Sequence, residues 1–244
     1  MKLSSNHLRF VVALLIGAVS WVGGCSASSK DGVTVTVTAE APRDPPLTAG
    51  ARAFDTSAGL HVTVTRAFLN TGAVEIFACP TAHRWLGLTV REARAHVVGS
   101  PTLLGTPLVA SLLAEDGART NVGELHPPPG SYCRVKQSIL PADADAPGSP
   151  ADGAMLGRSL LVEGTFGAPG EAPRPFRLTS TAAFDVETTV DPMVLSVEGH
   201  RVGVVVLFWK SAAWFDGVDL AAAGDDAATR LLANLRASLG ARVE

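Results

Sequence analysis

Short runs of β-branched and apolar residues, separated by Gly, Pro, Asn and Asp, make up the chain from residue 54 to residue 209. Runs of this length with turn residues between them are typical of strands joined by hairpins. They carry no amphipathic helical pattern of about 10–15 residues, which a parallel sheet of βαβ units would need. The sequence therefore predicts a mainly β domain, an antiparallel, Greek-key-like β-sandwich. The runs are residues 61–68, 73–79, 88–98, 107–114, 131–140, 159–166, 176–190 and 194–209.

Three of the residues between the first two runs have the composition of a tight turn. They are Asn70, Thr71 and Gly72, and Asn and Gly are the residues that favour two-residue hairpin loops. We therefore expect residues 61–68 and 73–79 to form the two strands of one hairpin.

The segment before residue 54 is harder to assign. Residues 33–38 alternate Val and Thr, which is the pattern of a strand with one buried face. Residues 41–50 follow, and they are too rich in proline for a helix or a central strand. We expect residues 25–53 to be a tether or stalk, and residues 54–244 to be the sandwich domain. The sequence leaves open whether residues 33–38 join the sheet.

One helix is predicted at the C-terminal end, over residues 225–239. Asp225 and Asp226 supply an N-cap and negative charge for its first turn, and Gly240 is placed as a C′ residue. The apolar residues recur at helical spacing on one face, which we expect to pack on the sandwich. They are Ala228, Leu231, Leu232, Leu235 and Leu239.

Composition excludes two classes of protein. The 244 residues are 47% hydrophobic and 18% charged, which is unlike a disordered chain. The formal net charge is −3, so the chain has no overall positive field for nucleic acid.

The N-terminus has the pattern of an export signal. Lys2 and Arg9 precede an uncharged apolar run over residues 10–23. This run fits a signal-peptide core of about 7–15 residues and is shorter than the ~20 residues of a membrane-spanning helix. It ends in the sequence V-G-G-C, in which the cysteine is Cys25.

These four residues resemble the lipobox of bacterial lipoproteins. The resemblance implies that residues 1–24 are removed and that Cys25 carries acyl chains, palmitate among them. Ser26 follows the cysteine, and by resemblance to the sorting rule of enteric bacteria this favours the outer membrane, on the side facing the periplasm. Several acyl chains make a stable anchor. Because the exported domain is acidic, we expect the lipid, and not the protein surface, to hold it at the membrane.

Two further cysteines, Cys79 and Cys133, remain in the domain. An exported chain meets an oxidising compartment, so an even pair of cysteines predicts a disulfide. The alternative is a thiolate metal site, but neither a Cys-x-x-Cys nor a Cys-x-His spacing occurs.

Two short segments resemble known families. Residues 130–135, G-S-Y-C-R-V, resemble a strand of β-sandwich lipoproteins in domain-of-unknown-function family 4382. Residues 214–219, W-F-D-G-V-D, are similar to the ending of periplasmic copper-binding proteins from methanobactin operons. The set of four cysteines found in that copper-binding family is absent here.

The short motifs of common hydrolases, nucleotide-binding proteins and EF-hands do not occur in the chain. His83 lies soon after Cys79 and His126 lies before Cys133, so a disulfide would draw these two histidines together. Imidazole suits copper or zinc, and Met155 or Met193 could add a soft ligand for Cu(I).

Two other groups of residues have a functional and a structural interpretation. Aspartates at the end of the chain could offer oxygen ligands to Ca²⁺, or they could cap turns and the helix. Trp214 and Phe215 could form a surface for a partner, or they could fill the core. The aspartates are Asp216, Asp219, Asp225 and Asp226, with a second group at Asp143 and Asp145.

The sequence thus predicts a lipid-anchored envelope protein that acts as a binding or structural module and not as an enzyme. It would meet the membrane through the lipid on Cys25, have no nucleic-acid partner, and bind another envelope protein if its aromatic surface is exposed. The alternative is a periplasmic copper-binding protein.

Overall fold

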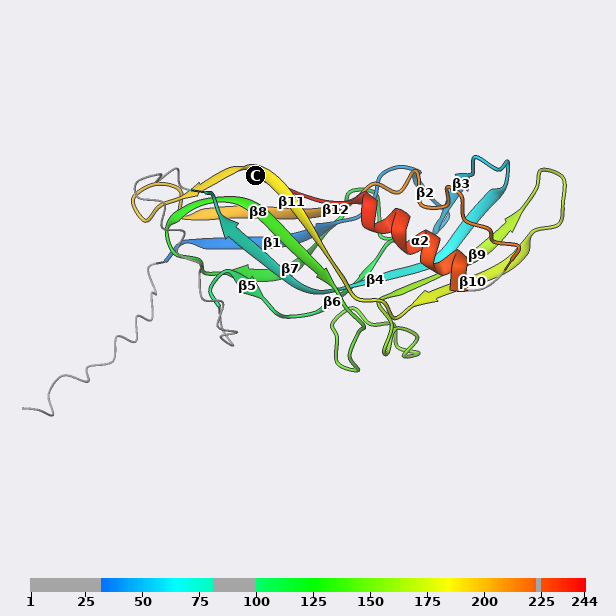
Figure 1. The fold of residues 1–244 in the computed structure, drawn as a ribbon, viewed down its shortest axis with the longest axis horizontal. Helices are drawn as coiled ribbons and strands as arrows, with labels where there is room; N and C mark the ends of the chain where they lie inside the picture. Colours follow the sequence, from blue (N-terminus) through cyan, green and yellow to red (C-terminus); the bar gives the residue numbers. More distant parts are fainter. Residues whose placement is uncertain (1–31, 81–99, 223–224) are drawn as a thin grey trace, which may run out of the picture. The chain divides into compact units, whose positions relative to one another are not determined.

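The computed structural model describes residues 32–80, 100–222 and 225–244, which fold as one unit (Figure 1). Two sheets and one helix make up this described part, and the helix is too short to cross a membrane. The predicted mainly β, sandwich-like fold with a C-terminal helix is confirmed. The elements are β1 (Thr34–Glu40), β2 (Leu47–Thr48), β3 (Ala51–Asp55), β4 (His61–Ala78), β5 (Leu103–Leu104), β6 (Leu108–Ser111), β7 (Arg119–Leu125), β8 (Gly130–Ile139), β9 (Leu160–Gly167), β10 (Arg174–Ser180), β11 (Phe184–Leu195), β12 (Val202–Trp209), α2 (Asp225–Ser238) and β13 (Leu239–Val243).

The smaller sheet has the strand order β13-β12-β1-β7. Its strand β1 is parallel to β12 and antiparallel to β7, so one parallel pair interrupts the antiparallel pattern that we expected. Val35 and Val37 of β1 are fully buried, whereas the threonines between them lie on the opposite face. Residues 33–38 therefore join the sheet. The boundary predicted at residue 54 is too late, because β1, β2 and most of β3 precede it.

The larger sheet is built around β4, which is 18 residues long. The first half of β4 pairs with β3 and β9, and its second half pairs with β8. Strands β5 and β6 also pair with β4, while β10 and β11 extend the sheet beyond β9 and β8.

The predicted hairpin turn at residues 70–72 is wrong, because these residues lie inside β4. Asn70 and Thr71 are buried, and their side chains bond to the carbonyl oxygen of Leu140 and to Gln137, each at 2.9 Å. A Cβ atom at Gly72 would come within 2.6 Å of the Leu140 side chain. Gly72 therefore allows the Leu140 side chain to approach the strand closely, and Asn70 and Thr71 form buried hydrogen bonds, all within one continuous strand.

Two other predicted strands are interrupted in the structure. Residues 176–190 contain the gap between β10 and β11, and residues 194–209 contain the turn between β11 and β12. Residues 88–98 lie outside the described residues.

The main core cluster takes buried side chains from both sheets and from α2. A second, smaller cluster surrounds Met155. In Figure 1, α2 lies beside β10, with which it is in contact. Leu231 and Leu235 of the helix are fully buried, as its apolar spacing predicted. The helix ends at Ser238, but Gly240 does not adopt the positive φ of a capping glycine. It lies in β13 opposite Phe208, whose ring leaves no room for a Cβ atom.

Candidate functional site

The chain joins the domain beside the turn that connects β11 of the larger sheet to β12 of the smaller sheet. The N–H of Thr34 donates to the carbonyl oxygen of Arg201 at 2.7 Å, and Thr34 lies opposite Val202 in the sheet. Strand pairing brings the loop before β8 to the same place, because Gly130 pairs with Leu195 and Leu125 pairs with the start of β1. We call this part of the domain the tether end, made of residues 32–34, 79, 125–133 and 194–202.

The predicted disulfide between Cys79 and Cys133 is present, and it lies at the tether end. It joins the end of β4 to β8, with 4.9 Å between the two Cα atoms. The N–H of Cys79 also donates to the carbonyl oxygen of Ser131 at 2.7 Å. The covalent bond thus reinforces a strand pair that is already hydrogen-bonded.

The metal hypothesis is tested only in part. His126 is exposed in the loop between β7 and β8, whereas His83 and Cys25 lie outside the described residues. Within residues 32–80, 100–222 and 225–244, no three His, Cys, Asp or Glu side chains are grouped to hold a metal ion. Met193 and Met155 are buried in apolar clusters.

Trp214 and Phe215 do not form a partner surface, because both side chains are buried. Their rings pack on Phe54 of β3, with ring centroids 5.9 and 5.0 Å away. The indole N–H of Trp214 donates to the hydroxyl of Ser238 at 3.2 Å. The structural interpretation of these aromatic residues is the right one.

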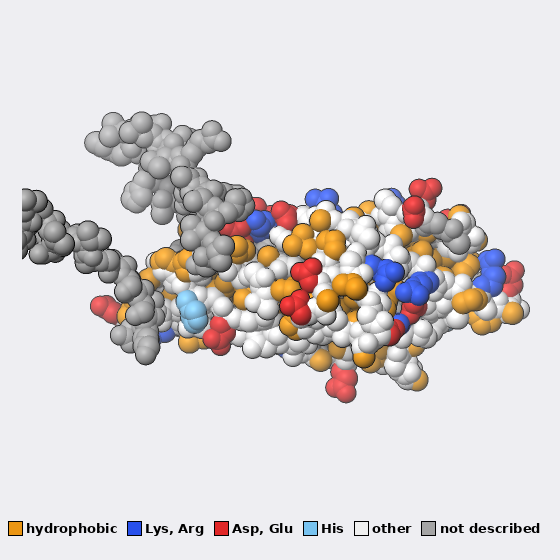
Figure 2. All heavy atoms as spheres, turned by 90° about the horizontal axis from the view of Figure 1, so that it is seen from below, with side chains coloured by type: hydrophobic (Ala, Val, Ile, Leu, Met, Phe, Trp, Pro, Cys, Tyr) orange, Lys and Arg blue, Asp and Glu red, His pale blue; other side chains and the backbone are white. Residues whose placement is uncertain are grey.

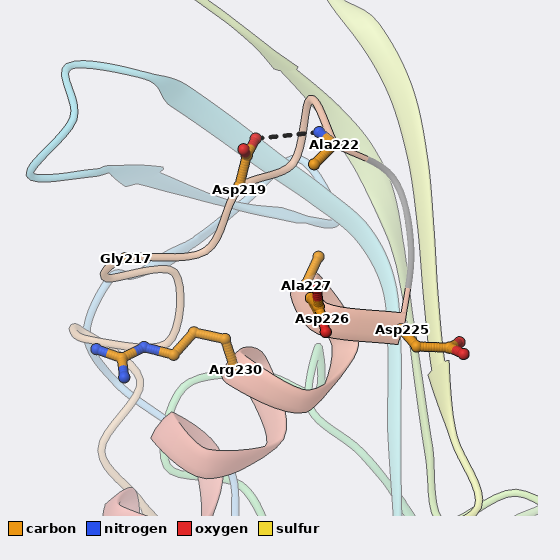
Figure 3. Close-up of a pocket in the computed structure, with 7 residues that line it drawn as sticks. All are labelled: Gly217, Asp219, Ala222, Asp225, Asp226, Ala227 and Arg230. Carbon is orange, nitrogen blue, oxygen red and sulfur yellow. Dashed lines mark hydrogen bonds between the residues drawn. The ribbon is translucent and has the colours of Figure 1, made fainter.

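The acidic residues near α2 line an open pocket of about 440 Å³ (Figure 3). Asp219 accepts hydrogen bonds from the N–H groups of Ala221 and Ala222, at 2.9 and 3.0 Å. Asp225 points away from Asp219 in Figure 3, and Arg230 adds a positive charge to the lining. The carboxylates therefore diverge, and the one on Asp219 stabilises a turn. Asp143 and Asp145 line another open pocket, in the loop of residues 141–158.

A network of charged residues that we did not predict crosses the outer face of the smaller sheet. Glu40, at the end of β1, is buried and accepts from Arg242 at 2.5 Å, from Arg119 at 3.2 Å and from Arg43 at 3.1 Å. Burial alone would raise the pKa of Glu40, but these hydrogen bonds outweigh it, and its pKa lies below the ordinary value. Arg119 also binds Glu244 at 2.7 Å, so the network joins β7, β1 and β13.

The same network borders a pocket of about 370 Å³ at the end of β12, where Lys210 and Trp209 also line it. The indole nitrogen of Trp209 is buried and has no hydrogen-bond partner within the described residues. Spacing could not reveal this site, because its members come from segments far apart in the sequence.

One further pocket, of about 440 Å³, holds a paired histidine. Nδ1 of His61 lies 3.0 Å from the carboxylate of Asp55, directly across the β3–β4 pair. Both side chains are largely exposed, so water screens the interaction. On the face shown in Figure 2, apolar, acidic and basic side chains are interspersed.

Comparison of the chain with models of protein families, with curated proteins and with solved structures found no match.

Proposed function

We propose that this protein is a bacterial lipoprotein, held by acyl chains on Cys25 in the outer membrane and facing the periplasm. It acts there as a non-catalytic binding or structural module. The V-G-G-C sequence, the apolar run before it and Ser26 after it support this proposal.

The main structural support for the proposal is the place at which the chain enters the fold. Cys25 and Gly32 are seven residues apart, a length that spans at most about 25 Å. The chain then enters β1, which is hydrogen-bonded on both sides by β12 and β7. A short tether that leads directly into a central strand suits a domain that is held close to the membrane by one defined end.

The disulfide gives independent support for export. Disulfides form and persist in oxidising compartments, such as the bacterial periplasm, and are rare in the cytosol. The bond between Cys79 and Cys133 therefore agrees with the signal-like N-terminus.

Metabolic labelling with radioactive palmitate tests the proposal. We expect label in the membrane-bound protein, and neither label nor membrane binding in a Cys25→Ser variant of the full chain. A Ser26→Ala variant is the matched control and should be labelled like the unchanged protein. Equal labelling of the Cys25→Ser variant, or a protein that stays in the soluble fraction, would contradict the proposal.

A second candidate is a periplasmic copper-binding protein. The disulfide favours it, because the bond holds the strand that precedes His83 beside the strand that follows His126. The test is metal analysis of the intact protein from an oxidising compartment, compared with a His83→Ala, His126→Ala double variant. Stoichiometric copper that disappears in the double variant would establish the site, and a protein that stays empty on copper titration would exclude it.

A further inference from the structure

The pocket at the end of β12 combines an apolar floor with basic side chains. Its apolar lining residues include Pro42 and Trp209, which are buried, and Phe208, which is half-buried. The Phe208 ring lies against Gly240, where a Cβ atom would come within 2.6 Å of the ring, and the guanidinium group of Arg242 lies 5.7 Å from the ring centroid. The ring is thus held in place and offers aromatic surface to the pocket.

Basic residues outnumber acidic residues in the lining of this pocket. Three are basic and two are acidic, so one positive charge is left in excess. Within the described residues, the ammonium group of Lys210 forms no ion pair or hydrogen bond, and the residue is exposed. This excess of charge favours an anion over a neutral or cationic ligand. The five residues are Arg43, Lys210, Arg242, Glu40 and Asp44.

Arg43 also has a donor to spare. Its Nε and Nη2 both donate to one oxygen of Glu40, at 3.2 and 3.1 Å, and its side chain is 68% exposed. Glu40 accepts from Arg119 and Arg242 as well, so three guanidinium groups share one carboxylate. A second carboxylate, supplied by a ligand, would therefore meet unsatisfied donors on Arg43 and on Lys210.

Hydrogen bonds hold the walls of the pocket together. The hydroxyl of Ser211 donates to the carbonyl oxygen of Asp44, which joins the segment after β12 to the segment after β1. The backbone N–H of Lys210 donates to the carbonyl oxygen of Ser238, the last residue of α2, at 3.1 Å. Because these contacts form the pocket without a ligand, binding requires little ordering of the chain.

We propose that this pocket binds a small, free monocarboxylate with an apolar body. Lys210 and Arg43 bind the carboxylate, and the apolar body rests on Phe208. A single negative charge matches the single positive charge in excess, and the volume of about 370 Å³ suits a small ligand. This inference rests on the proposed role as a binding module, to which it gives a ligand, and not on the acylation of Cys25.

Isothermal titration calorimetry of the intact protein in an uncharged detergent tests the proposal. The probe is phenylacetate, and phenylacetamide is the matched uncharged compound; titrations into detergent alone are subtracted. Lys210→Met removes the free ammonium group, and Ala212→Trp fills the pocket from an exposed residue of its lining. Lys136→Met is the control, because Lys136 lies on β8 and is paired with Glu75 at 2.7 Å.

We expect phenylacetate to bind about tenfold more tightly than phenylacetamide, and Lys210→Met to weaken its binding about tenfold, the equivalent of one charge-assisted hydrogen bond. Ala212→Trp should abolish binding, and Lys136→Met should leave it unchanged. Equal binding by Lys210→Met and the unchanged protein would overturn the proposal. So would undiminished binding by Ala212→Trp, or no binding of phenylacetate at millimolar concentrations.

A tripeptide that ends in phenylalanine distinguishes a free acid from the end of a peptide chain. If the tripeptide bound more tightly than phenylacetate, the free acid would be overturned in favour of a peptide terminus. The intact mass of the same preparation shows whether Cys25 is acylated, so loss of the ligand site and loss of the anchor are told apart.

Discussion

The guanidinium group of Arg52 donates a hydrogen bond to the carboxylate of Asp116 at 2.8 Å, although the Arg52 side chain is completely buried. Its other N–H groups donate to the carbonyl oxygens of Pro45, Leu112 and Ala114, at 2.5, 3.1 and 3.0 Å. One side chain of β3 thus holds both the segment before β2 and the loop after β6.

Replacing Arg52 with Met should lower the free energy of unfolding by about 3 kcal/mol, because several charge-assisted hydrogen bonds are lost together. Urea denaturation measures this change. The control is Arg177→Met, which removes a half-exposed arginine and should cost less than about 1 kcal/mol. A similar loss in both variants would show that the buried network is not a stabilising feature.

Glu40→Gln should destabilise the fold by about 2 kcal/mol, because the amide cannot replace a carboxylate that binds three arginines. Glu187→Gln is a matched control, since Glu187 forms one exposed ion pair with Arg134 at 2.7 Å. We expect its effect on unfolding to stay below about 1 kcal/mol. If the two variants were equally stable, the arginines around Glu40 would contribute nothing.

The lowered pKa of Glu40 also predicts a dependence of stability on pH. A carboxylate with a lowered pKa in the folded state stabilises the fold fully above its unfolded pKa, about 4.3 for glutamate. That contribution is lost as the pH falls below this value towards the folded pKa. The free energy of unfolding should be measured from about pH 6 down to about pH 3, on either side of that pKa. The values for the unchanged protein and for Glu40→Gln should converge as the pH falls. A constant difference across this range would refute the assignment.

Removing the disulfide should reduce stability by about 4 kcal/mol, since the bond closes a long loop and restricts the unfolded chain. The Cys79→Ala, Cys133→Ala double variant should melt at a lower temperature than the unchanged protein. Adding a reducing agent should lower the melting temperature of the unchanged protein alone. Identical melting of the oxidised and reduced forms would argue against a stabilising role.

Gly164 of β9 lies directly against the backbone of β4, where a Cβ atom would overlap the carbonyl oxygen of Thr63. Gly164→Ala should therefore cost about 3 kcal/mol, because two backbones must separate. Gly105 has open space around its Cβ position, and Gly105→Ala should change stability by less than about 1 kcal/mol. Thermal melting of both variants distinguishes a specific close approach from a general effect of alanine.

Period-2 patterns predicted most strands, but not their partners. The alternation of residues 33–38 indicated a strand, whereas its parallel pairing with β12 joins residues more than 160 positions apart and has no local signal. At residues 70–72 the local signal was misleading. Asn and Gly favour turns, yet the same residues allow a long strand to receive the Leu140 side chain and carbonyl oxygen.

The disulfide could be predicted because an exported chain enters an oxidising compartment, where a pair of cysteines usually forms a disulfide. The aromatic residues at 214 and 215 were not, since the segment between β12 and α2 has no regular period to separate a buried face from an exposed one. The networks around Arg52 and Glu40 were also missed, because each assembles residues from distant strands and loops.

Intact-mass analysis of the protein extracted from membranes decides whether Cys25 is the acylated N-terminus. We expect a chain that begins at Cys25 and carries the added mass of a diacylglycerol group and an amide-linked acyl chain. A chain that begins at any other residue, or an unmodified cysteine at position 25, would contradict it.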